Sequence, residues 1–112
     1  MTMATEKPFV AVVLYESTCD SPDYQTLYRE DFVLVHARTE DEARELVRAR
    51  AEGEAGSHTN ERGEVITLSV KRVLDVAPAL DADLTRGGDL YSRHFTDFDA
   101  YRAFEPLLSE KD

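Results

Sequence analysis

Three kinds of side chain in this sequence could do chemistry: three histidines, one cysteine and several pairs of carboxylates. His36, His58 and His94 lie far apart, and none of them forms the i,i+4 pair with which a helix presents two metal ligands. Folding could still gather them, with Asp20 or Asp23 adding oxygen ligands. Metal sites usually show in the spacing of their ligands, so ordinary histidines are favoured and we predict no metal site.

Cys19 is the only cysteine and lies between Thr18 and Asp20. A nucleophilic cysteine needs a lowered thiol pKa, which a cation, a histidine or a helix N-terminus can supply. An adjacent aspartate has the opposite effect, so we interpret Cys19 as an incidental thiol. A single cysteine also excludes an intrachain disulfide, which favours a reducing compartment.

The paired carboxylates do not form a convincing catalytic set. Glu30 and Asp31 are neighbours on a predicted strand, so their side chains point to opposite faces. The pairs Asp20/Asp23 and Asp81/Asp83 fall in predicted loops, where acids are common turn formers. The sequence also lacks a Walker loop and the GxGxxG and GxSxG patterns. We therefore predict no catalytic residues and no cofactor, and favour a non-enzymatic role.

Two short segments are better candidates for a binding site. Tyr15 and Glu16 end a strongly apolar strand with polar side chains, a position where ligand groups often lie in α/β proteins. Tyr91 and Arg93 follow a loop, and tyrosine and arginine are favoured at protein interfaces. The alternative is that the Tyr91 to His94 segment only keeps a sheet edge soluble.

Size and charge narrow the class of protein. The chain has 112 residues, the size of one domain, and its 42% hydrophobic and 32% charged residues are an ordinary globular balance. Its net charge is −10. A negative field repels phosphate backbones and anionic lipid heads, so we expect neither nucleic acid nor a membrane as partner. The N-terminus does not resemble a signal peptide, and the apolar run 9–15 is too short to span a bilayer. We expect a cytoplasmic protein.

The pattern of apolar residues predicts an α+β fold with the order β-β-α-β-β-α. We expect residues 1–7 to be a frayed tail and 8–112 to form a single domain. The expected elements are strands over 9–15, 24–37, 64–70 and 90–95, a strand stub over 57–59, a helix over 40–52 and a last helix after Thr96. Short connections favour a mostly antiparallel sheet of about four strands, with both helices packed on one face.

Local signals mark how these elements begin and end. Thr39 and Glu42 form a capping box at the start of the first helix, which should bury Ala43, Leu46, Val47 and Ala51. Asn60 to Gly63 suits a hairpin turn, and the alternation slips at Arg72 to Leu74, which suggests a bulge. The last helix should bury an apolar stripe formed by Phe98, Tyr101, Phe104, Leu107 and Leu108.

Several of these motifs, in this order, resemble the DUF4288 proteins, a small bacterial family of unknown function. The resemblance rests on Leu14 to Ser17, Glu42 to Arg44, Asn60 with Gly63-Glu64, Arg72 to Val76, and Tyr91 to Arg93. Members often carry a tryptophan in the strand after the Gly-Glu turn, where this chain has Leu68 or Val70. The resemblance implies no established activity, cofactor or catalytic residue.

Two hypotheses of function follow. The first is a small acidic, non-enzymatic module that binds another protein, with Tyr91 and Arg93 on the binding surface and an exposed strand edge that would allow a homodimer. The second is a small-ligand-binding protein or enzyme with a pocket near Tyr15, Glu16 and Arg93. A concave pocket gathering these groups would favour the second hypothesis, and a flat exposed surface the first.

Overall fold

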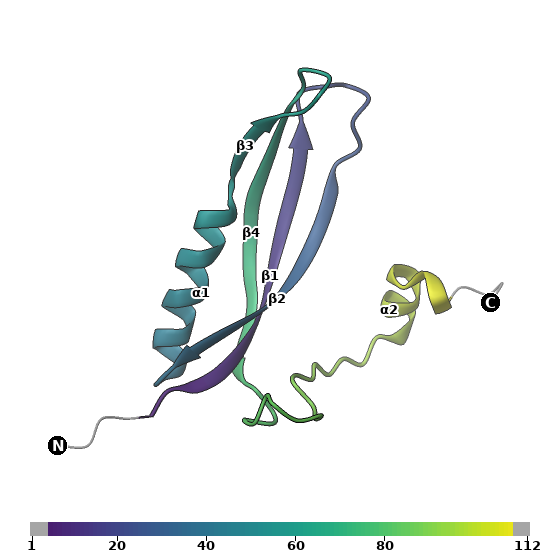
Figure 1. The fold of residues 1–112 in the computed structure, drawn as a ribbon. Helices are drawn as coiled ribbons and strands as arrows, with labels where there is room; N and C mark the ends of the chain where they lie inside the picture. The colour runs from purple at the N-terminus through teal and green to yellow at the C-terminus, as the bar shows by residue number, and fades with distance from the viewer. Residues whose placement is uncertain (1–4, 109–112) are drawn as a thin grey trace.

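The fold is a four-stranded antiparallel sheet with one helix packed on it and a second helix beyond it (Figure 1). The computed structural model describes residues 5–108. Its elements are β1 (Lys7–Cys19), β2 (Leu27–Ala37), α1 (Glu40–Glu54), β3 (Gly56–Thr59), β4 (Val65–Pro78), α2 (Phe98–Phe104) and the 3-10 turn η1 (Pro106–Leu108). The predicted α+β class and the order β-β-α-β-β-α are confirmed. Of the expected N-terminal tail, residues 1–4 lie outside the described residues and Lys7 already pairs with Ala37.

The central position of β1 explains why its sequence is apolar on both faces. The strand order is β2-β1-β4-β3, so β1 pairs with β2 on one side and with β4 on the other. Odd-numbered residues of β1, such as Phe9 and Val13, point toward the main core. Even-numbered Val10 and Val12 are also buried, on the opposite face of the sheet. A half-exposed strand would instead alternate apolar and polar residues.

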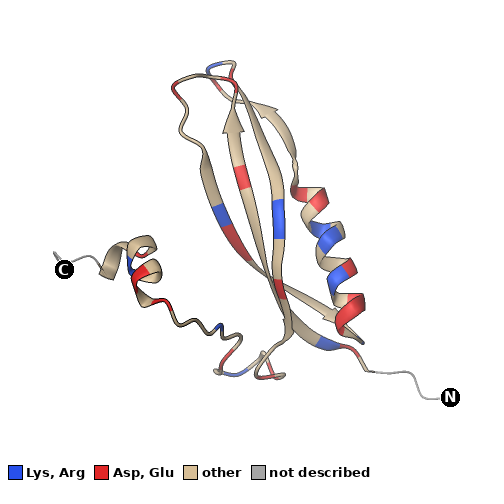
Figure 2. Cartoon of the chain, turned by 180° about the vertical axis from the view of Figure 1, so that it is seen from behind, with Lys and Arg blue, Asp and Glu red and all other residues tan. Residues whose placement is uncertain are grey.

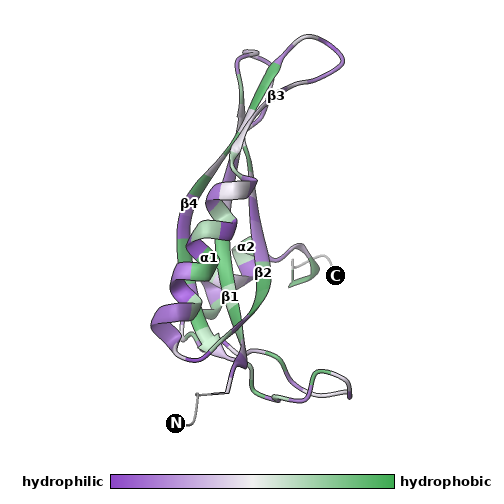
Figure 3. Cartoon of the chain, turned by 60° about the vertical axis from the view of Figure 1, so that its left-hand side comes forward, coloured by the Kyte–Doolittle hydropathy of each residue, from purple (hydrophilic) through white to green (hydrophobic). Residues whose placement is uncertain are grey.

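Helix α1 covers one face of the sheet (Figure 3). Its small apolar side chains meet β1, β2 and β4 there. Ala43, Val47 and Ala51 are buried, as predicted, while both signs of charge lie along the rest of the helix (Figure 2). Leu46 was expected to be buried but is 42% exposed. The buried stripe of α1 is narrow, because it consists only of positions 43, 47 and 51, which are spaced four residues apart. Leu46 therefore lies at the margin of this stripe.

The start of α1 confirms half of the predicted capping box. Thr39 is the N-cap, and its Oγ1 accepts a 3.1 Å hydrogen bond from the amide of Glu42. The Glu42 carboxylate does not return to the Thr39 amide, because it accepts from Nε of Arg38 at 3.2 Å. Thr39 is thus the side chain that satisfies one of the unpaired amides of the first turn.

The hairpin between β3 and β4 also forms where the sequence places it. Gly63 has φ +79°, a left-handed conformation that glycine adopts without strain. Its amide donates to the carbonyl of Asn60 at 3.1 Å, and the Asn60 side chain accepts from the amides of Arg62 and Glu64. The pairing of β4 with β1 shifts between Val12 and Val13 and between Leu14 and Tyr15, so β4 carries the predicted irregularity near residues 71–74.

The C-terminal third differs most from the prediction. Residues 90–95 do not form a strand, because this segment crosses a face of the sheet near Asp75 and not one of its hydrogen-bonding edges. Helix α2 begins after Asp97, one residue later than expected, and does not pack on the sheet beside α1 (Figures 1 and 2). None of its residues is buried.

The apolar stripe of α2 is therefore exposed and not covered as the sequence predicts. Its side chains are all at the surface, and they are Phe98, Tyr101 and Phe104 of α2 with Leu107 and Leu108 of η1, which follows α2. Tyr101 of the stripe stacks on Phe95, which precedes α2, with ring centroids 4.7 Å apart. The Cα radius of gyration is 17.8 Å, whereas a compact chain of this length has about 13 Å. Within residues 5–108, then, no element covers this stripe.

Candidate functional site

The face of the sheet opposite α1 carries a mixed polar and apolar surface. Strand pairing places the even-numbered residues of β1 and β2 on this face, so that Val12 pairs with Phe32 and Val10 with Leu34. Phe32 is 71% exposed and Leu34 is also exposed, although both are large and apolar. We call this surface the open face, defined by Tyr28, Glu30, Phe32 and Leu34 of β2.

Tyr91 attaches the C-terminal segment to the open face. Its phenol donates a 2.5 Å hydrogen bond to Oδ2 of Asp75 on β4, and its ring lies 6.2 Å from that of Phe32. Burial and the bond to the Asp75 carboxylate raise the pKa of Tyr91 to about 12, since both disfavour the phenolate. The phenol of Tyr91 is therefore already engaged in a hydrogen bond within the chain.

Arg93 and His94 lie against the open face a little further along the chain. Both line a cavity of about 440 Å³ between Glu30 and Phe32 of β2 and the aromatic side chains of α2. On a strand, Arg93 and His94 would point to opposite sides, but in this irregular segment both line the same cavity. Arg93 is exposed and offers a cation beside an apolar surface.

Tyr15 and Glu16 lie on opposite faces of β1 and cannot share a ligand. Tyr15 is 1% exposed in the core, and the guanidinium of Arg29 lies 4.8 Å above its ring. Burial is the main cause that raises the pKa of Tyr15, followed by the charge of Asp31. Glu16 pairs with Nζ of Lys71 at 3.4 Å. The structure thus brings Arg93 to Phe32 and does not gather Tyr15, Glu16 and Arg93 into one pocket.

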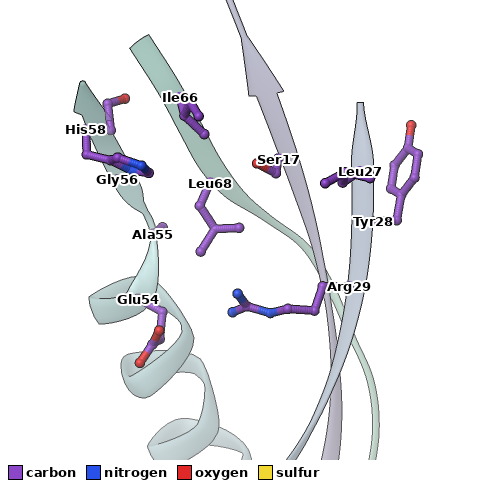
Figure 4. Close-up of a pocket in the computed structure, with 11 residues that line it drawn as sticks. Ser17, Leu27, Tyr28, Arg29, Glu54, Ala55, Gly56, His58, Ile66 and Leu68 are labelled. Atoms are coloured by element: carbon purple, nitrogen blue, oxygen red, sulfur yellow. The ribbon is translucent and has the colours of Figure 1, made fainter. Parts of the chain in front are cut away.

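A second cavity, of about 660 Å³, lies where α1 ends beside the strands (Figure 4). Leu27, Ile66 and Leu68 give it an apolar lining, and Glu54 and His58 stand at its rim. Arg29 points into it, but its guanidinium is already bound to both carboxylate oxygens of Asp31, at 2.8 and 3.1 Å. Its volume is in the range of small-molecule sites. No motif in the sequence indicates it, because its residues come from five separate elements.

Metal binding has no geometric support within residues 5–108. His36, His58 and His94 remain apart, and no group of three or more His, Cys, Asp or Glu side chains in this range could hold a metal ion. Cys19 is free, and its Sγ lies 3.7 Å from Oδ1 of Asp20. Over the same range, no helix is long and apolar enough to cross a membrane.

These features define a small α+β protein with one helix-covered sheet face and one open face, to which the C-terminal segment is attached through Tyr91. The chain belongs to the family described as a domain of unknown function, DUF4288, whose model matches residues 8–92. The match covers the whole sheet, α1 and Tyr91, and ends before α2. No curated protein and no solved structure matches the chain.

Proposed function

We propose that this protein is a non-enzymatic module that binds another protein through the open face and the apolar stripe of α2. The observation that carries the proposal is the exposure of that stripe: Phe104 is 73% exposed on a helix that buries none of its residues. Large exposed apolar patches on a folded protein mark interaction sites. Helical side chains that repeat at core-like spacing and remain uncovered need a partner to remove them from water.

The residues around the stripe suit a protein partner. Aromatic side chains dominate it, and Arg93 stands beside Phe32 in the adjoining cavity. Aromatic residues and arginine are enriched at protein interfaces and among the side chains whose truncation costs the most affinity. With a net charge of −10, nucleic acid and anionic membranes remain unfavoured as partners. A cytoplasmic location, expected from the cysteine content, remains a prediction.

The test is capture of partners from the native host on immobilised protein. We expect Phe104→Glu and Arg93→Glu to lose the same captured protein, because a lost interface anchor costs about 2 kcal/mol or more. Leu46→Glu, an exposed leucine on α1, is the matched control and should retain it. All three variants should melt close to the wild type, since an exposed substitution moves stability by about 0.5 kcal/mol or less. Equal capture by the wild type and both interface variants would contradict the proposal.

A second candidate function is small-molecule binding in the 660 Å³ cavity at the end of α1. Its size and its apolar lining of Leu27, Ile66 and Leu68 favour an apolar or amphipathic ligand. The chain has no tryptophan, so Leu68→Trp would both fill the cavity and introduce a unique fluorophore. We expect Leu68→Trp to weaken binding of the dye anilinonaphthalene sulfonate more than Phe104→Glu does. The reverse order would assign the dye to the open face.

A further inference from the structure

The outer edge of β2 is a long and unpaired strand edge. β2 is the terminal strand of the sheet and has 11 residues, Leu27–Ala37, and none of the described residues pairs with its outer side. It contains neither proline nor lysine, two residues with which proteins block such edges. Four of its apolar side chains are exposed, namely Leu27, Tyr28, Phe32 and Leu34. An edge of this kind is a template for pairing with another chain.

The edge is complementary to itself in the register that pairs its full length. Two antiparallel copies of β2 that pair over all 11 residues place Phe32 opposite the second copy's Phe32. Glu30 then stands opposite Leu34, and Asp31 opposite Val33, so no like charges face each other. Shorter registers centred on Glu30 or Asp31 would set a carboxylate against its own copy, which is destabilising. The full-length register thus pairs the most residues and sets no like charges against each other.

The chain as a whole exposes enough extra area to supply a dimer interface. The chain exposes 8729 Å², whereas a folded monomer of 12.7 kDa exposes about 6,200 Å². Even if the eight residues outside the described range are counted as fully extended chain, the rest exposes about 1,500 Å² more than expected. A standard interface takes about 800 Å² from each partner, and obligate homodimers take more.

We propose that the partner of the open face is a second copy of this chain, joined by antiparallel β2–β2 pairing about a two-fold axis at Phe32. This inference rests on the proposed function, because it names the occupant of the same surface. An axis perpendicular to the sheet leaves both α1 helices on one face of an eight-stranded sheet. Both C-terminal segments then lie on the other face, where Phe32 is. There the apolar stripe of each α2 covers the seam between the two copies.

The decisive experiment measures the molar mass of the purified protein by light scattering over a dilution series. We expect the wild type to be a dimer and Phe32→Glu to raise the dimer dissociation constant by about 100-fold or more, because two carboxylates then meet at the axis. Phe32→Lys should be weakened similarly. An equimolar mixture of the two variants should form the mixed dimer, since opposite charges then face each other. Leu46→Glu is the control and should remain dimeric.

These outcomes test the β2–β2 dimer separately from the proposed binding function. A monomeric wild type, a dimeric Phe32→Glu variant, or failure of the mixture to associate would overturn the β2–β2 dimer. Phe32 is 71% exposed, so its variants should retain the wild-type circular dichroism and melting temperature. If the wild type is monomeric but still captures a host protein that Phe104→Glu does not, the binding function survives and only the second copy as partner is rejected.

Discussion

The phenol of Tyr91 donates a 2.5 Å hydrogen bond to the carboxylate of Asp75, which lies 16 positions earlier in the sequence. This bond holds the start of the C-terminal segment on the open face, beside Phe32. Beyond Tyr91 the segment passes Arg93 and His94, which line a cavity with Phe32, and continues to α2, which lies away from the sheet (Figure 1). The start of the segment that leads to α2 is thus held by a side-chain contact.

Tyr91→Phe should destabilise the protein by about 1.5 kcal/mol, the low end for a hydrogen bond to a charged group, because the site is only half-buried. The folded pKa of Tyr91, about 12, lies above the usual value of 10.0. The bond's contribution is therefore complete below pH 10 and is lost as the pH rises toward 12. Denaturant unfolding of both proteins at neutral pH and near pH 12 should show the difference between them shrinking. A constant difference would mean that the phenol does not titrate as described.

Thr39→Ala should lower the free energy of unfolding by about 1 kcal/mol, through loss of the bond from the Glu42 amide to the Thr39 hydroxyl. Thr39→Ser retains the hydroxyl and is the control. Urea unfolding of the three proteins measures the effect. An unchanged midpoint for the alanine variant would show that another group caps α1.

Gly63→Ala should destabilise by about 1 kcal/mol or more, because an L-residue is strained at φ +79°. Gly53→Ala is the matched comparison. Gly53 lies in α1 with open space around its Cα, so alanine there should stabilise by about 0.5–1 kcal/mol. Thermal unfolding should move in opposite directions for the two variants. Shifts of the same sign would contradict the left-handed turn at Gly63.

Val47→Ala should cost about 2 kcal/mol, because Val47 is 1% exposed and its removal leaves a cavity in the core beneath α1. Leu46→Ala removes more atoms from a side chain that is 42% exposed and should cost about 1 kcal/mol or less. Chemical denaturation of both variants tests which face of α1 is buried. A larger loss for Leu46→Ala would show that Leu46 is buried, as the sequence predicts.

Much of the fold follows from local sequence alone. The cap at Thr39, the hairpin turn at Gly63 and the apolar run of β1 each depend on residues within a few positions of one another. Such signals act through local backbone geometry and side-chain periodicity, so they can be recognised in the sequence before any tertiary contact is known. The family could be recognised for the same reason, since its motifs are local.

Only the tertiary structure decided how the C-terminal third is placed and what the site residues do. The sequence predicts Tyr15 and Glu16 at the end of the first strand. It predicts Tyr91 and Arg93 within a strand over 90–95, and it offers all four as binding residues. Strand pairing buries Tyr15, pairs Glu16 with Lys71 and leaves Arg93 exposed beside Phe32. The sequence predicts a buried stripe on α2 but cannot say what buries it, because amphipathic spacing records that a face must be covered and not which surface covers it.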